Sequence, residues 1–331
     1  MDLPLLWAGI ISFAVLTYVV LDGFDLGIGI LFPFFPDAQD RDVMMNSIAP
    51  VWDGNETWLV LGGGGLLAAF PLAYAVLMPA LYPLVIAMLL GLIFRGVAFE
   101  YRFKTSRQTV WNWGFAGGSI VAALSQGIML GAILQGVAVS GRTYGGGWFD
   151  WLSPFSLFCG LSLIVGYTLL GATWLIIKTS GELQQRLFKL VPVPGIAFIL
   201  CIAVVSIWLP LRDPVAAERW FTFPASAVFW TVPIVVAFLA MGFYVALHRR
   251  NEHWPYWISL AFFLISFAGF AITLYPYVVP RTITLWEAAA PDDSLIFLLV
   301  GTVILVPMII GYTAYAYWVF RGKVKVGEGY H

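Results

Sequence analysis

The chain has 331 residues, of which 61% are hydrophobic and 11% are charged, and its formal net charge is −1. Soluble globular proteins carry about 25% charged residues, so this composition excludes a soluble protein and predicts an integral membrane protein. The near-neutral charge and the lack of a long basic cluster give no reason to expect a nucleic acid partner.

The apolar runs predict about nine membrane-spanning helices, since a helix needs about 20 apolar residues to cross the hydrocarbon core. We therefore expect an all-α, polytopic fold, with two four-helix bundles plus one peripheral helix. Residues 1–331 should form a single integral membrane domain with no separate soluble domain. The N-terminal run shows no small-residue cleavage site, which argues against a removed signal peptide. The expected spans are residues 5–32, 52–74, 77–101, 114–139, 155–178, 190–210, 226–247, 256–278 and 295–320.

Basic residues predict the orientation of these spans. Lys and Arg are concentrated in the connections after the third, fifth and seventh spans and after the ninth span. Such loops face the cytoplasm, so nine spans place the N-terminus outside and the C-terminus inside. The loop of residues 36–51 is acidic although it falls on the cytoplasmic side, but acidic residues contribute little to this rule.

Two aspartates lie inside the first apolar run. Asp22 and Asp25 are three residues apart, which places both on one face of a helix. Two neighbouring carboxylates in a medium of low dielectric constant cannot both ionise cheaply, so at least one should hold a proton. The residues alone favour proton handling and a purely structural role equally.

The polar stretch Trp52–Trp58 begins the second span. Asp53 could cap this helix, and Glu56 could complete a reciprocal capping box. Both carboxylates could instead mark a pathway, because ionisable groups in membrane helices are costly and usually functional. The Asn55-Glu56-Thr57 sequon at a cytoplasmic border is a chance match, and the glycines of residues 62–65 favour helix packing.

Arg95 and Glu100 lie in the last turns of the third span. They are five residues apart and should point to different sides of the helix. We expect Arg95 to be the counter-ion of one of the acids, although a long side chain near a helix end could also extend to the membrane surface.

The chain offers few ligands for a metal or a haem. Its three histidines, His248, His253 and His331, lie in a basic loop and at the terminus, and Cys159 and Cys201 are its two cysteines. Haem in a membrane protein usually has axial His or Met ligands, and methionines in apolar helices mostly serve packing. We expect no metal site and no cofactor ligated by this chain.

Five motifs, in order along the chain, carry a family resemblance. They are residues 21–27 (LDGFDLG), 46–58 (NSIAPVWDGNETW), 94–102 (FRGVAFEYR), 272–277 (ITLYPY), and the closing pair 311–313 (GYT) and 317–322 (YWVFRG). With these motifs the chain resembles subunit II of the cytochrome bd-type quinol oxidases, and is most similar to their cyanide-insensitive branch.

The resemblance implies a nine-helix subunit of a respiratory quinol:oxygen oxidoreductase in a bacterial inner membrane. Its partner, subunit I, would hold two b-type haems and a d-type or third b-type haem, oxidise quinol near the outer face and reduce oxygen to water. A small accessory subunit and a bound quinone or lipid would be compatible with this family.

The resemblance implies that, as in some family members, protons for oxygen reduction come from the cytoplasm along acids of subunit II at the subunit interface. By position these are Asp53 and Glu100, while Asp22 and Asp25 lie in another shared motif, with Glu56 and Arg95 in support. Glu56 and Glu100 depart from the Gln and Asp of other members, and an acid at position 56 could change which group holds the proton. The alternatives are a proton-coupled secondary transporter, in which Asp22, Asp25 and Arg95 bind a solute, and a purely structural subunit.

Overall fold

The structure is a computed structural model of the chain, and it describes residues 1–212, 214–223, 225–325 and 327. It is almost entirely helical. The helices are α1 (Leu3–Leu31), the 3-10 turn η1 (Phe32–Phe34), α2 (Ala38–Asn46), α3 (Trp52–Ala69), α4 (Pro71–Arg102), α5 (Gln108–Gln135), α6 (Pro154–Lys178), α7 (Gly181–Leu190), α8 (Pro192–Arg212), α9 (Pro214–Phe221), α10 (Ala225–His248), α11 (Trp254–Leu274), α12 (Leu285–Ala288) and α13 (Asp292–Val319). Two small antiparallel hairpins pair β1 (Val139–Ser140) with β2 (Thr143–Tyr144) and β3 (Tyr277–Val279) with β4 (Ile283–Thr284).

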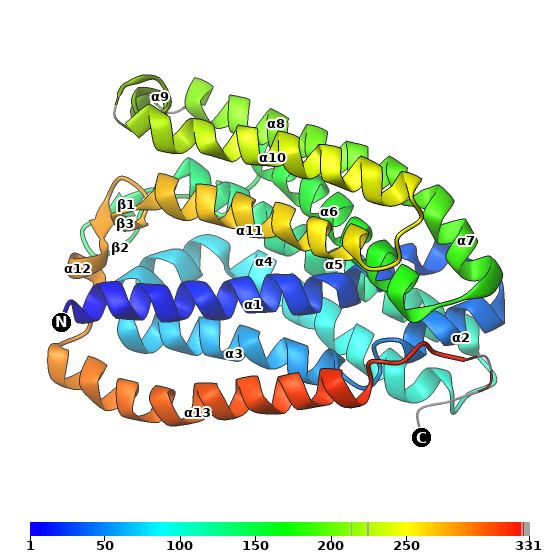
Figure 1. The fold of residues 1–331 in the computed structure, drawn as a ribbon. Helices are drawn as coiled ribbons and strands as arrows, with labels where there is room; N and C mark the ends of the chain where they lie inside the picture. Colours follow the sequence, from blue (N-terminus) through cyan, green and yellow to red (C-terminus); the bar gives the residue numbers. More distant parts are fainter. Residues whose placement is uncertain (213, 224, 326, 328–331) are drawn as a thin grey trace.

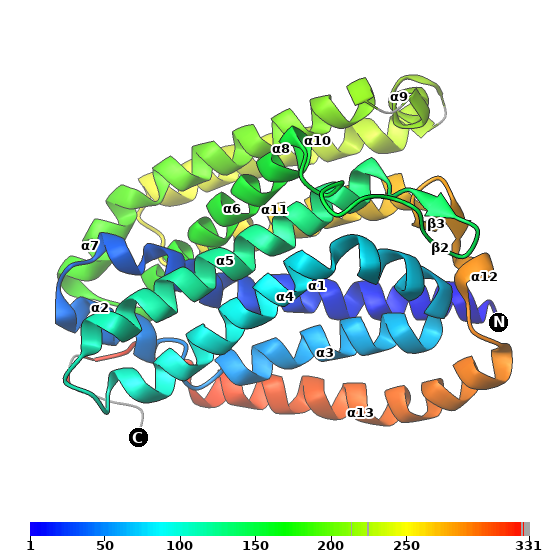
Figure 2. The same cartoon turned by 180° about the vertical axis from the view of Figure 1, so that it is seen from behind.

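The long helices run roughly side by side in two groups (Figure 1). Helices α1, α3, α4 and α5 pack together, and α6 joins them to a second group with α8, α10 and α11. Helix α13 lies outside, along α1 and α3, as the view from behind also shows (Figure 2). The expected arrangement of two four-helix bundles and a peripheral helix is therefore confirmed.

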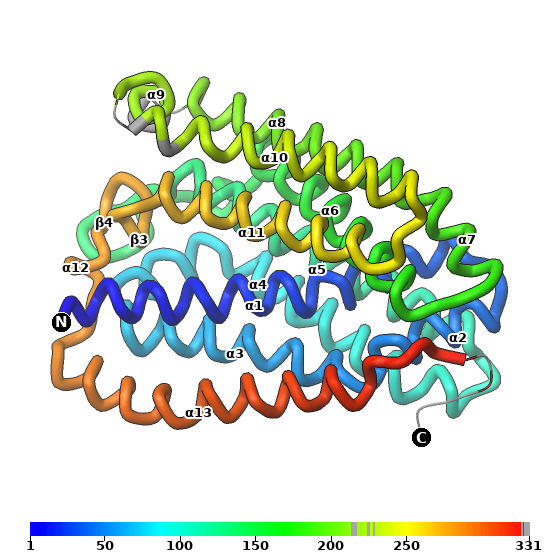
Figure 3. The backbone as a smooth tube through the Cα atoms, viewed as in Figure 1, coloured from blue at the N-terminus to red at the C-terminus, as the bar shows by residue number. Residues whose placement is uncertain are grey.

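The molecule has two distinct ends (Figure 3). The N-terminus, both hairpins and α12 lie at one end, which we call the hairpin end. Helices α2 and α7 and residues 320–325 lie at the other end, which we call the α2 end. Ion pairs tie the connections at the α2 end together, joining Arg186 to Asp40 at 2.9 Å and Lys323 to Glu252 at 2.8 Å. The basic connections that were predicted to share one side do lie at this end.

Most predicted spans match long helices, and the described residues contain nine helices of 18 residues or more. Eight stretches are long and apolar enough to cross a membrane by length and composition. The exception is α3, whose first two turns carry the polar residues of the Trp52–Trp58 stretch. Helix α3 nevertheless lies alongside α1 and α13 (Figure 1).

The observed helices differ from the sequence-based expectation in several places, and α4 and α5 each begin six residues earlier than expected, at Pro71 and Gln108. The second span ends at Ala69 rather than near residue 74, because Pro71 starts α4 and the residue before a proline is disfavoured in the helical region. Helices α2 and α7 fall in segments expected to be loops. Both are short and polar, so the search for long apolar runs could not find them.

Small residues bring α1 and α6 into close contact. A Cβ atom added to Gly171 of α6 would lie 2.6 Å from the backbone of Gly27 and of Ile28 in α1. Gly62 and Gly65 of α3 face Val15 and Ile11 of α1 in a similar way, as expected for glycines that serve helix packing. The core of the first bundle depends on these approaches.

We therefore predict that Gly171→Ala destabilises the protein while Gly117→Ala does not. The first change forces α1 and α6 apart, and overpacking of this kind costs about 1–3 kcal/mol. Gly117 of α5 has open space where its Cβ would be, so alanine there should be neutral or slightly stabilising. Thermal unfolding of the purified membrane complex measures both effects, and equal midpoints for the two variants would contradict the packing argument.

Candidate functional site

A cluster of charged side chains lies inside the first bundle, near its α2 end. Asp22 and Asp25 of α1 are both fully buried, one helical turn apart on the same face. The fully buried guanidinium of Arg95, from α4, lies against both of them. The face expected for the two aspartates is confirmed.

Arg95 pairs with three acids rather than one. Its Nη1 donates to Asp22 Oδ1 at 2.7 Å and to Glu56 Oε1 of α3 at 2.8 Å. Its Nη2 lies 3.7 Å from Asp25 Oδ2. The predicted counter-ion role is confirmed, and the alternative in which Arg95 extends to the membrane surface is wrong.

The cluster has more acids than bases. Three carboxylates face one guanidinium, so full ionisation would leave two uncompensated negative charges in a buried, low-dielectric site, where unpaired charges cost several kcal/mol each. Asp22 Oδ2 and Asp25 Oδ1 are buried and have no hydrogen-bond partner among the described residues. This charge balance supports the prediction that at least one of these acids holds a proton.

Asn55 completes the cluster, and the sequence analysis missed its role. Its Nδ2 donates to Asp25 Oδ2 at 2.7 Å and to the Leu21 carbonyl at 3.4 Å, and its Oδ1 accepts from the Tyr317 hydroxyl of α13 at 2.9 Å. A carboxamide in a membrane helix by itself indicates a buried hydrogen-bond partner, because an unsatisfied polar group is costly there.

A chain of uncharged, hydrogen-bonded side chains, which we call the neutral arm, extends from the cluster toward α5 and α6. Tyr18 lies one helical turn before Asp22, beside its carboxylate. The Tyr18 hydroxyl accepts from Gln126 Nε2 at 2.7 Å, and Gln126 Oε1 accepts from the Tyr167 hydroxyl at 2.8 Å. This arm ends among aromatic rings, since Tyr167 stacks on Phe263.

Asp53 lies at the surface, at the start of α3. Val51 is the N-cap residue of this helix and makes no side-chain capping bond, so Asp53 is not the cap that its position had suggested. Glu56 bonds Arg95 and does not close a capping box. The exposed residues of α3 follow one stripe along the helix from this acid: Asp53, Thr57, Val60, Gly63, Gly64 and Leu67.

Glu100 lies at the α2 end of the adjacent helix α4, on the opposite side from Arg95 as expected. Its carboxylate is 66% exposed and accepts from Lys104 Nζ at 2.8 Å, a hydrogen bond that raises the pKa of Lys104 above its ordinary value. Glu100 ends an exposed stripe of α4 that contains Ile86, Leu89, Ile93 and Val97. Helices α3 and α4 are in contact near Glu100, where the ring of Trp52 stacks on that of Phe99 with the ring centroids 4.8 Å apart.

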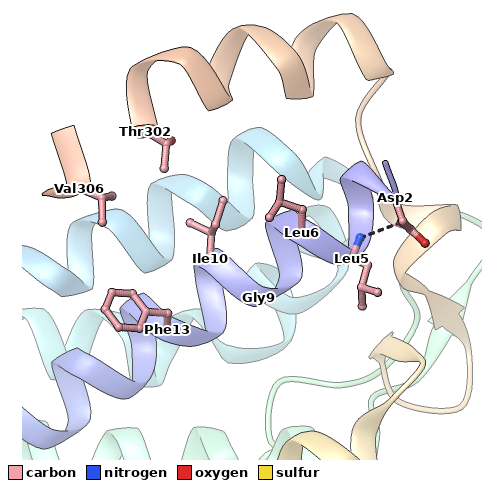
Figure 4. A pocket seen from close by; sticks show the side chains of 8 residues that line it. All are labelled: Asp2, Leu5, Leu6, Gly9, Ile10, Phe13, Thr302 and Val306. Atoms are coloured by element: carbon pink, nitrogen blue, oxygen red, sulfur yellow. Dashed lines mark hydrogen bonds between the residues drawn. The ribbon is translucent and has the colours of Figure 1, made fainter. Parts of the chain in front are cut away.

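A groove of about 550 Å³ lies elsewhere, between α1 and α13 toward the hairpin end (Figure 4). Its walls are apolar, with Leu6, Ile10 and Phe13 on one side and Val306 on the other, and Asp2 lies at its edge. None of the clustered acids lines it. The groove is therefore separate from the charged site.

The described residues contain no group of three or more His, Cys, Asp or Glu side chains arranged to hold a metal ion. His248 ends α10 and His253 precedes α11, both at the α2 end, while His331 lies outside the described residues. That this chain ligates no haem stays a prediction.

Comparison with known proteins identifies the family. The family model described as cytochrome bd terminal oxidase subunit II matches residues 3–320, nearly the whole chain. This chain belongs to that family. The resemblance found in the sequence motifs is thereby confirmed, while membership of the cyanide-insensitive branch stays a prediction.

Relatives of this subunit II chain match it from end to end. Cytochrome bd-I ubiquinol oxidase subunit 2 of Escherichia coli (strain K12) is 30% identical over 97% of this chain and 95% of its own length. Cytochrome bd ubiquinol oxidase subunit 2 of Bacillus subtilis (strain 168) is 26% identical over 98% and 97% of the two chains. A chain of the solved bd oxidase of Geobacillus thermodenitrificans has the same fold, with a TM-score of 0.78 at 18% identity over 97% of this chain and 99% of that one.

Arg95 should be essential for the stability of this subunit. We predict that Arg95→Gln lowers the thermal midpoint and the yield of the assembled oxidase, because removing one partner of a buried ion pair costs about 3–5 kcal/mol. Arg186→Gln is the matched control, since Arg186 is 50% exposed and surface pairs contribute about 0–1 kcal/mol. Comparable yields and midpoints for the two variants would refute the central role of Arg95.

Proposed function

We propose that this subunit II supports the haem-bearing subunit I of a quinol oxidase and delivers protons to it from the cytoplasm. The observation that carries the proposal is the row of acids from the surface to the buried cluster. Asp53 is exposed, Glu56 lies one turn further along α3 with 23% of its side chain exposed, and Asp22 and Asp25 are fully buried. Acids in such a series can pass a proton stepwise, with Arg95 moderating their charge.

We place the contact with subunit I on the exposed stripes of α3 and α4. Gly63 and Gly64 of α3 have open space where their Cβ atoms would lie, and such glycines allow another helix backbone to approach closely. Each stripe ends in an acid, Asp53 or Glu100, at the α2 end. A lipid face would disfavour these charges, whereas a contact with polar groups of a partner subunit would accommodate them.

The α2 end is the cytoplasmic end in this proposal. The connections richest in Lys and Arg lie there, and such loops remain inside. The N-terminus and both hairpins then face outward, and residues 1–331 form one multi-pass domain of the bacterial cytoplasmic membrane. Protons that enter past Asp53 and Glu100 come from the cytoplasm.

This orientation gives the oxidase a way to generate membrane potential without a pump. Two quinols and one O₂ yield two quinones and two waters, and the four protons from quinol leave on the outer side while four protons enter from the cytoplasm. The family's haems, two b-type and one d-type or third b-type in subunit I, would carry the electrons to oxygen. The residues of this chain orient the acids and hold the protons that complete water formation.

Membership of the subunit II family removes the secondary transporter as an alternative. A purely structural role remains the competing outcome. In that case the buried cluster would only join α1, α3 and α4, and the exposed acids would only contact subunit I. A bound quinone or lipid and an accessory subunit are further predictions of the family resemblance.

Neutral, isosteric substitutions of the surface acids test the proton route. We expect Asp53→Asn and Glu100→Gln each to lower oxygen consumption at least about tenfold, equivalent to about 1.4 kcal/mol in the activation barrier. Oxygen uptake and membrane potential are measured in vesicles that contain the assembled complex. Glu182→Gln, an exposed acid of α7, is the control and should leave both unchanged.

The purely structural alternative makes the opposite prediction. If Asp53→Asn and Glu100→Gln assemble with full haem content and keep the wild-type oxygen consumption and its pH dependence, the proton route is wrong.

A further inference from the structure

Asp25 is reached by a directional chain of hydrogen-bond donors from α13. Asn55 Oδ1 can only accept, so the Tyr317 hydroxyl must donate to it, at 2.9 Å. This contact leaves the amide nitrogen of Asn55 facing α1, where it donates to Asp25 Oδ2 at 2.7 Å. The Leu21 carbonyl and Asp25 Oδ2 can only accept, so they keep the amide nitrogen of Asn55 toward α1, while the Tyr317 hydroxyl holds the amide oxygen on the other side.

The two oxygens of Asp25 differ as a result. Oδ2 accepts from Asn55 and lies 3.7 Å from Nη2 of Arg95, so donors already surround it. Oδ1 is buried and has no hydrogen-bond partner in the part of the chain that the structure describes. A proton that arrives at Asp25 would therefore bind at Oδ1.

No other described group around Asp25 makes the hydrogen bond that Asn55 donates to it. Asp22 of α1 and Glu56 of α3 are acids that repel its negative charge, and Arg95 of α4 and Tyr256 of α11 also face it. Among the described residues, Asn55 makes the one side-chain hydrogen bond to Asp25, since Arg95 Nη2 lies at the longer distance of 3.7 Å.

The Tyr317 ring is held firmly although α13 is loosely attached elsewhere. Within the described chain, Leu295 is the one fully buried residue of α13. The Tyr317 ring packs edge-on against Trp174 and Phe24, with ring centroids 5.9 Å and 6.5 Å away. The Lys178 ammonium, at the end of α6, donates to the Phe320 carbonyl just after α13. These contacts fix the Tyr317 hydroxyl over Asn55.

We propose that Asn55 and Tyr317 are positioning residues that hold Asp25 with Oδ2 occupied by a donor and Oδ1 open to the transferred proton. The inference rests on the proposed proton route and adds two residues to it. It gives α13 a role in proton handling although α13 contributes no acid to the cluster. Without the Tyr317 hydroxyl, Asn55 Oδ1 loses its hydrogen bond, and the amide is less firmly held against Asp25.

Infrared spectroscopy of the intact oxidase tests the proposal directly. Asp25→Asn assigns the stretching band of the protonated Asp25 carboxyl in pH-difference spectra. We expect Tyr317→Phe to shift this band and lower turnover about tenfold, equivalent to about 1.4 kcal/mol, while keeping the ring contacts. Tyr315→Phe, which removes an exposed hydroxyl from the same helix, is the matched control and should leave band and turnover unchanged.

A double-mutant cycle distinguishes two residues that act through one hydrogen-bond chain from two residues that contribute to turnover independently. If Tyr317 acts through Asn55, the double variant Asn55→Leu/Tyr317→Phe should be no slower than Asn55→Leu alone. Haem content verifies that each variant assembles with subunit I. If Asn55→Leu does not assemble, the infrared spectrum of Tyr317→Phe alone decides whether Tyr317 positions Asp25.

Three outcomes would overturn the inference: Asp25→Asn removes no carboxyl band, Tyr317→Phe matches Tyr315→Phe in band and turnover, or the two substitutions are additive. The infrared band does not depend on Asp53 or Glu100. A failure here therefore remains distinct from a failure of the proton route, which the surface acids test.

Discussion

The contact of the Arg95 guanidinium with Asp22 and Glu56 is the interaction on which the first bundle depends. It joins α4 to α1 and α3 in the core of a membrane protein, where each buried ion without a partner would cost several kcal/mol. A cation with one acid would suffice for stability. The presence of three acids around one cation instead creates a site whose charge depends on bound protons.

Close helix packing surrounds this site. Glycines of α1, α3 and α6 let backbones approach, as at Gly27 and Gly171, and leave little room between the helices around the cluster. Since membrane helices gain little from hydrophobic association with one another, such contacts and the buried hydrogen bonds provide most of their attraction. Helix α13 lacks a comparable packed face, and its hydrogen bonds to other helices within the described residues lie near its two ends, at Leu295 and Tyr317.

The acids form a graded series of exposure, which is the basis of the proposed proton route. Asp53 and Glu100 are exposed at the α2 end, Glu56 is partly covered, and Asp22 and Asp25 are enclosed. A group that exchanges protons with water must be accessible, whereas one that controls the transfer must be shielded. The Tyr18, Gln126 and Tyr167 arm lies on the far side of the cluster and consists of neutral groups.

The sequence by itself determined the membrane class, the nine long helices, the common face of Asp22 and Asp25, and the family, because apolar length, helical spacing and ordered motifs are local properties of the chain. The tertiary structure alone decided that Arg95 binds three acids, that Asn55 donates to Asp25, and that Tyr317 donates to Asn55. Helices that are apolar all round do not reveal their rotation or their neighbours from periodicity. The partners of a buried polar group, such as Tyr317 for Asn55 at a separation of 262 residues, are therefore fixed only when the helices pack.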